Sequence, residues 1–102
     1  MIIDIKEGML MNELEIERNK INEIDEKMLD LFVKRMECSK KIGLYKEKHN
    51  LPIFDENREN EIISNKLSKF NNDELKEYYL SFIKDLMDIS KKYQKDIIKD
   101  DK

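Results

Sequence analysis

Apolar residues recur along the first half of the chain at alternating steps of three and four, the spacing of one face of an α-helix. This stripe comprises Ile21, Ile24, Met28, Leu31, Cys38, Ile42 and Tyr45. Asn12 and Glu15 have the spacing of a capping box, so the helix is predicted to start there. The pattern continues to about His49, where Asn50 and Pro52 break it, and the predicted helix is therefore more than ~50 Å long.

Two further helices are predicted after this break. Asp55 is placed to cap a short second helix, whose apolar side comprises Ile62, Ile63, Leu67 and Phe70. The next polar turn supplies Asn72 or Asp73 as the cap of a third helix, which is expected to end at about Ile98. One stripe of this third helix carries Leu75, Tyr79, Phe82, Leu86, Ile89 and Tyr93.

The fold predicted from these stretches is an all-α domain over residues 12–98, with a long first, a short second and a long third helix. Residues 1–11 are an unassigned N-terminal extension, and residues 99–102 form a charged tail. A chain of 102 residues makes a single domain that is narrower than the first helix is long. Such a helix needs a packing partner along its whole length, and a second copy of the chain is the simplest candidate for that partner.

Composition excludes several classes of function. A net charge of −3 argues against a nucleic-acid binder, which usually carries a basic surplus. Residues 1–11 are too short and too charged for a signal peptide or a membrane span, so a cytoplasmic protein is expected. The single cysteine, Cys38, has no disulfide partner and no metal-ligand cluster around it, and is expected to pack in the core.

A regular row of lysines on the first helix is interpreted as a solvated face rather than as a binding stripe. The row comprises Lys20, Lys27, Lys34, Lys41 and Lys48. Glu23, Asp30 and Glu37 each precede a lysine of this row by four residues, the favourable order for ion pairs within a helix.

Other polar residues fall where apolar ones are expected. Arg35 occupies a stripe position between Leu31 and Cys38, and Lys46, eleven residues on, points nearly the same way. A charge on a buried face is costly unless something pairs with it. Arg35 therefore either binds an anion, pairs with an inward acid, or extends to the edge of the core.

The second and third helices add polar residues of the same kind. Ser90 and Gln94 lie one turn apart beside the apolar stripe of the third helix. Arg58 opposes the helix dipole in the first turn of the second helix, which suggests another role for it. Arg18 is seventeen residues from Arg35, about 25 Å along one helix, so a single small ligand reaches both only if a paired antiparallel helix supplies one of them.

In combination, these residues resemble the all-helical (type II) chorismate mutases from about Leu14 to Gln94. The resemblance rests on Arg18 in ERNKINEIDEKML, Arg35 in FVKRMECSKKIG, Lys46 in GLYKEK, Asp55, Arg58 and Glu59 in PIFDENRENEI, and Ser90 and Gln94 in DISKKYQ. It implies an intertwined helical homodimer with two equivalent sites, each borrowing Arg18 from the other chain. It also implies the rearrangement of chorismate to prephenate, on the route to phenylalanine and tyrosine.

The resemblance further implies a role for each matched residue. Arg35 and the partner's Arg18 would hold the two carboxylates of the substrate, and Lys46 and Gln94 would donate hydrogen bonds to its ether oxygen. Glu59, with backbone groups near Asp55, would bind the hydroxyl of the substrate. Ser90 would contact one of its carboxylates, and Arg58 would support the carboxylate end or brace the site. This intramolecular Claisen rearrangement needs no cofactor, metal or nucleophile. The one histidine, His49, is therefore interpreted as a helix-end residue rather than as an acid–base group.

Two other functions stay open at this point. An isochorismate-pyruvate lyase shares the fold and much of the site, and its substrate is also a cyclic dianion with an enolpyruvyl ether. A non-catalytic helical dimer that regulates a partner enzyme would use the same fold without turnover. The residues alone do not separate the mutase from the lyase, although the closeness to the mutase pattern favours the mutase. The complete polar set argues against a loss of catalysis.

Overall fold

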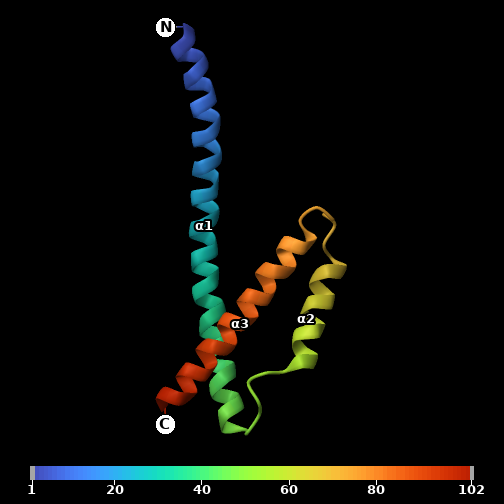
Figure 1. The fold of residues 1–102 in the computed structure, drawn as a ribbon. Coiled ribbons are helices and arrows are strands. Elements are labelled where there is room, and N and C mark those ends of the chain that lie inside the picture. Colours follow the sequence, from blue (N-terminus) through green and yellow to red (C-terminus); the bar gives the residue numbers. More distant parts are fainter. Residues whose placement is uncertain (1, 102) are drawn as a thin grey trace. The chain divides into compact units, whose positions relative to one another are not determined.

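The computed structural model describes the backbone of residues 2–101 and the side chains of residues 12–99. Three helices follow one another along the chain: α1 over Ile2–Lys48, α2 over Glu56–Ser68 and α3 over Lys76–Asp101 (Figure 1). No strand occurs within residues 2–101. The predicted all-α fold with a long, a short and a long helix is therefore confirmed.

The start of α1 differs from the prediction. The helix begins at Ile2 and passes through Asn12 and Glu15 without a break, so the capping-box interpretation of these two residues was wrong. A cap is needed only where backbone N–H groups lack helical partners. Residues 2–11 contain one glycine and no proline, and their carbonyls continue the helix on the N-terminal side of Asn12.

The end of α1 matches the prediction, and its hydrogen bonds explain why it ends there. Asn50 adopts a positive φ of 56°. The N–H of Leu51 donates to the carbonyl of Lys46 at 2.8 Å, and the N–H of Asn50 donates to the carbonyl of Glu47 at 3.3 Å. This pair of bonds is a Schellman motif, in which asparagine tolerates the left-handed conformation better than most residues.

The two later helices start close to the predicted caps. The carboxylate of Asp55 accepts a hydrogen bond from the backbone N–H of Arg58 at 3.0 Å, as expected of the N-cap of α2. Before α3, the side-chain oxygen of Asn72 accepts from the N–H of Leu75 at 3.2 Å. At its other end α3 continues to Asp101, past the predicted end at Ile98. No helix in the described part of the chain is both long and apolar enough to cross a membrane.

The chain divides into two compact units, residues 1–35 and 36–102. In the first unit, every described residue from 12 to 34 is exposed. Its large hydrophobic side chains have exposed fractions between 39% and 63%, and they comprise Leu14, Ile16, Ile21, Ile24, Met28, Leu29, Leu31, Phe32 and Val33. The apolar side chains of the predicted stripe that belong to this unit are therefore exposed.

The second unit contains the core, in which α2 packs against α3 (Figure 1). The buried face of α3 follows Ile83 and Met87 and continues through half-buried Ser90 to buried Gln94. These positions are one residue away from the predicted stripe, of which Leu75, Phe82 and Ile89 stay exposed. Tyr79, Leu86 and Tyr93 of the predicted stripe are half-buried, so the buried face of α3 lies along one edge of that stripe rather than at its centre.

Two smaller predictions about side chains on α1 were also wrong. Cys38 is exposed in the single chain rather than packed in its core. Within residues 12–99, Lys20 pairs with Glu17 at 3.2 Å, and the three predicted ion pairs of the lysine row do not form. Exposed ion pairs contribute little energy, so side-chain entropy decides which of them persist.

A close approach between α1 and α3 occurs at Gly43. A Cβ added to this glycine would lie 2.9 Å from Cγ and 3.0 Å from Cβ of Gln94, closer than packed carbon atoms approach. Glycine inside a helix costs about 1 kcal/mol relative to alanine. The absence of a side chain at position 43 is therefore what lets the stem of Gln94 lie against α1.

Gly43→Ala is expected to destabilise the fold by about 1–3 kcal/mol, because Gln94 or the backbone of α3 must move to admit the methyl group. Urea unfolding measures the effect, with exposed Lys40→Ala on the same helix as the control. Alanine has the higher helix propensity, so local propensity alone would stabilise the variant. A midpoint at or above that of the wild type would show that the close approach is not tight.

Candidate active site

The buried polar cluster of the second unit joins α1 to α3 through two hydrogen bonds in series. Nε2 of Gln94 donates to Oγ of Ser39 at 3.0 Å, and Oγ of Ser39 donates to the backbone carbonyl of Ser90 at 3.2 Å. Ser39 and Gln94 have exposed fractions of only 4% and 6%. Oε1 of Gln94 is also buried and has no hydrogen-bond partner among the described residues. The amide therefore has unused hydrogen-bonding capacity in a place that water barely reaches.

Lys46 lies half-buried near the end of α1. Its Nζ donates to the backbone carbonyl of Ile53 at 2.9 Å, which ties the helix to the segment before α2. An ammonium group has three donors, so this contact leaves two for a ligand. The contact also holds the positive charge of Lys46 next to the end of α1. Among the described residues, Lys46 forms no ion pair with a carboxylate.

Glu59, in the first turn of α2, pairs with Lys91 of α3. Nζ of Lys91 lies 3.0 Å from Oε2 of Glu59 and 3.2 Å from Oδ1 of Asp88, and 4.7 Å from the centre of the Phe54 ring. The hydrogen bond to Glu59 is the main cause that raises the pKa of Lys91 above its usual value. The ion pair uses Oε2 of Glu59, and Oε1 takes no part in it.

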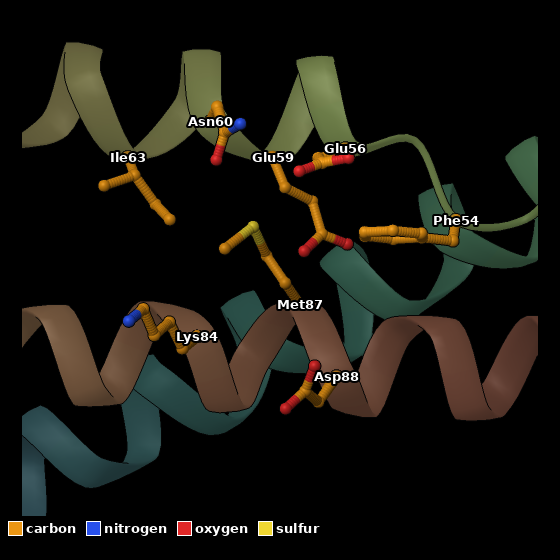
Figure 2. A pocket seen from close by; sticks show the side chains of 8 residues that line it. All are labelled: Phe54, Glu56, Glu59, Asn60, Ile63, Lys84, Met87 and Asp88. Carbon is orange, nitrogen blue, oxygen red and sulfur yellow. The ribbon is translucent and has the colours of Figure 1, made fainter.

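An open pocket of about 290 Å³ lies between α2 and α3 next to this ion pair. Figure 2 shows Glu59 and Phe54 at one end of it, with Met87 and Ile63 facing each other across it. Of the site residues predicted from the sequence, Glu59 alone lines this pocket. The pocket therefore does not by itself gather the predicted set.

The remaining predicted residues are placed as follows. Arg58 is exposed, and its Nη1 lies 3.4 Å from Oε1 of Glu61, while Asp55 is used as the cap of α2. Arg18 is exposed and Arg35 is half-buried, and both belong to the first unit. His49 stacks on Tyr45 with ring centres 3.9 Å apart and lies 2.8 Å from the Tyr45 carbonyl, in line with a helix-end role.

Two residues of this region were not assigned a role from the sequence. Ser39 has no role in the sequence analysis, yet it contacts both Gln94 and the Ser90 carbonyl. Ser39 and Gly43 are two small residues one turn apart, a spacing that allows another helix to approach closely. This spacing is the sequence signal that could have indicated the contact of Ser39 with α3. Lys91 carries no such signal, because a lysine next to Ser90 is indistinguishable from a surface residue in the sequence.

The chemistry available in the second unit is that of a binding and polarising site. It offers an ammonium group, a buried amide and a paired carboxylate, all from residues distant in sequence. No group of three or more potential metal-ligating side chains occurs in the described part of the chain. Fixed N–H donors of this kind can bind an anionic ligand and stabilise negative charge on it.

Comparison with known proteins gives the family of the chain but no individual relative. Searches of curated proteins and of solved structures found no significant match to the chain. A sequence model of the family described as chorismate mutase type II matches residues 17–95, which is more than half of the chain and includes all eight of the predicted site residues. The three-helix fold is that expected of an all-helical family of this kind. The chain therefore belongs to the chorismate mutase type II family.

Proposed function

We propose that this protein catalyses the rearrangement of chorismate to prephenate. The observation that carries the proposal is the buried Gln94 amide, whose Nε2 donates one N–H to Ser39 and keeps the second for a ligand. In this reaction one C–O bond breaks while one C–C bond forms, within one molecule. The catalyst must hold a flexible dianion in its reactive shape and stabilise the negative charge that grows on the ether oxygen.

The proposed stabilisation of the ether oxygen uses Lys46 and Gln94. Lys46 supplies a fixed positive charge, because its contact with the Ile53 carbonyl limits the motion of its long side chain. Gln94 supplies an N–H whose donor capacity does not depend on pH. In a partly desolvated site, two donors directed at the same developing charge stabilise it far more strongly than they would in water.

The two carboxylates of the substrate are assigned to Arg35 and to Arg18 of the partner subunit. The planar guanidinium group binds a carboxylate through two parallel hydrogen bonds. The exposed apolar side chains of residues 12–34 support a homodimer, since a second copy would bury a surface that the single chain leaves in water. The dimer is proposed to intertwine through this part of α1.

The other matched residues are assigned supporting roles. Glu59 accepts from the substrate hydroxyl through the oxygen that Lys91 does not occupy, with backbone help near Asp55. Ser90 contacts a carboxylate, and Arg58 braces the carboxylate end. A cytoplasmic place in phenylalanine and tyrosine synthesis follows from this reaction and is part of the same proposal.

A direct assay of chorismate consumption, with identification of prephenate, tests the proposal. The same preparation is offered isochorismate and monitored for pyruvate, which is the product expected of the lyase. Its mass in solution is measured in parallel and is expected to be that of two chains. A dimer that consumes neither substrate would favour the non-catalytic regulatory function instead.

Gln94→Glu is expected to be active only at acidic pH. A glutamate donates a hydrogen bond only when protonated, and burial at this position raises its pKa above the ordinary value of about 4.3. The rate should therefore fall about tenfold for each pH unit above that pKa. A pH profile of kcat measures this, with the wild type over the same range as the control. If the pH profile of the variant runs parallel to that of the wild type, Gln94 does not act as a hydrogen-bond donor to the substrate.

A further inference from the structure

We propose that Ser39 is a positioning residue, which determines the end of the Gln94 amide that faces the substrate. The inference rests on the proposed function for its effect on the reaction. The orientation of the Gln94 amide on α3 by a serine on α1 rests on the two hydrogen bonds alone.

The first step concerns the proton of the Ser39 hydroxyl. The backbone carbonyl of Ser90 can only accept, and it lies 3.2 Å from Oγ of Ser39. In this bond the hydroxyl therefore donates its proton to Ser90. What remains on Oγ toward Gln94 is lone-pair density.

The second step concerns the amide itself. A hydroxyl that has already donated its proton can accept from Nε2 of Gln94, and this bond is 3.0 Å long. Turning the amide over would place Oε1 against the same lone pairs, unless the hydroxyl gave up its bond to Ser90. Only one of the two amide orientations is thus compatible with the Ser39–Ser90 bond. In that orientation the second N–H of Nε2 points away from Ser39 and is left for a ligand.

The third step is that, among the side chains of residues 12–99, Ser39 is the one that bonds the amide head of Gln94. Ser39 and Gln94 are both more than nine-tenths buried, so bulk water cannot replace the hydroxyl. Gly43, one turn after Ser39, lies against the stem of Gln94. Gly43 therefore locates the stem, and Ser39 orients the head. Since neither serine nor glutamine ionises, the orientation is the same at every working pH.

Ser39→Ala is expected to lower kcat for chorismate by about 3- to 10-fold with little change in KM, the effect of losing one ordinary hydrogen bond that acts on the reaction step. In a Gln94→Ala background the same substitution should change kcat less than twofold, because the group that it orients is gone. Exposed Ser81→Ala on α3 is the control and should match the wild type. Ser39→Cys, which keeps nearly the same volume and bonds weakly, should resemble Ser39→Ala.

A second measurement is independent of turnover. By NMR, the side-chain amide protons of Gln94 should exchange slowly with solvent in the wild type and faster in Ser39→Ala. If the wild type rearranges no chorismate but this protection is present and Ser39-dependent, the proposed function fails and the orienting role stands. Equal losses of kcat in both backgrounds, or Gln94 exchange that does not change in Ser39→Ala and Ser39→Cys, would overturn the inference.

Discussion

Replacing Lys46 by alanine is expected to lower the turnover of chorismate by about 10²–10³-fold, the cost of removing one donor from a developing oxyanion. The structure holds the Lys46 ammonium through one bond to the Ile53 carbonyl, so two N–H groups stay available to the substrate. The loss should fall mainly on kcat, because the charge on the ether oxygen grows only as the bond breaks. Steady-state kinetics with chorismate measures it.

The matched control for this variant is Lys48→Ala, which removes an exposed lysine two residues along the same helix. It should retain the wild-type rate. Loss of the Ile53 contact is expected to reduce stability slightly in Lys46→Ala, so helix content, unfolding midpoint and solution mass are compared first. A folded Lys46→Ala protein with most of its activity would exclude Lys46 from the mechanism.

Arg18→Ala and Arg35→Ala are each expected to be inactive, whereas an equal mixture of the two should recover about a quarter of the wild-type activity. After random exchange of subunits, about half of the dimers contain one chain of each kind. In such a dimer one site keeps Arg35 of one chain with Arg18 of its partner, and the other site lacks both arginines. Chorismate consumption before and after mixing measures the recovery.

The mixture requires evidence that subunits exchange, which mass spectrometry of differently labelled chains provides. Lys20→Ala mixed with Arg35→Ala is the matched control for a nearby surface charge, because Lys20 is exposed and pairs only with Glu17. Confirmed exchange without recovery would show that the two arginines act in the same chain or not at all.

Local signals predicted the helix boundaries well wherever the chain itself stops a helix. Asn50 and Asp55 act through bonds to residues within five positions of them, so their effect does not depend on the rest of the fold. The capping-box signal at Asn12 failed for a related reason. A cap stabilises a helix start but does not break a helix that has already begun upstream.

The buried face of α3 was harder to predict, because two apolar stripes lie side by side on it. One carries Leu75, Phe82 and Ile89, and the other carries Ile83 and Met87. Helical periodicity states which residues share a face, but not which face meets α1 and α2. In the folded chain it is the second stripe that is buried, and it runs directly into Ser90 and Gln94.

The sequence by itself determined that the chain is helical, where α1 ends and α2 begins, and which polar residues stand out against the helix patterns. It also indicated that α1 is too long to be covered by its own chain, and residues 12–34 are indeed exposed. These conclusions depend on residues close together in the chain, or on one helix, where spacing alone sets direction.

Only the tertiary structure decided which polar groups meet. Ser39 and Gln94 are 55 positions apart, and Glu59 and Lys91 lie on different helices. Whether such groups touch depends on how far one helix is turned against another, and a single glycine at position 43 sets that approach here. The packing of α3 against α1 therefore converts Gln94 from an ordinary surface-type residue into a buried, oriented donor.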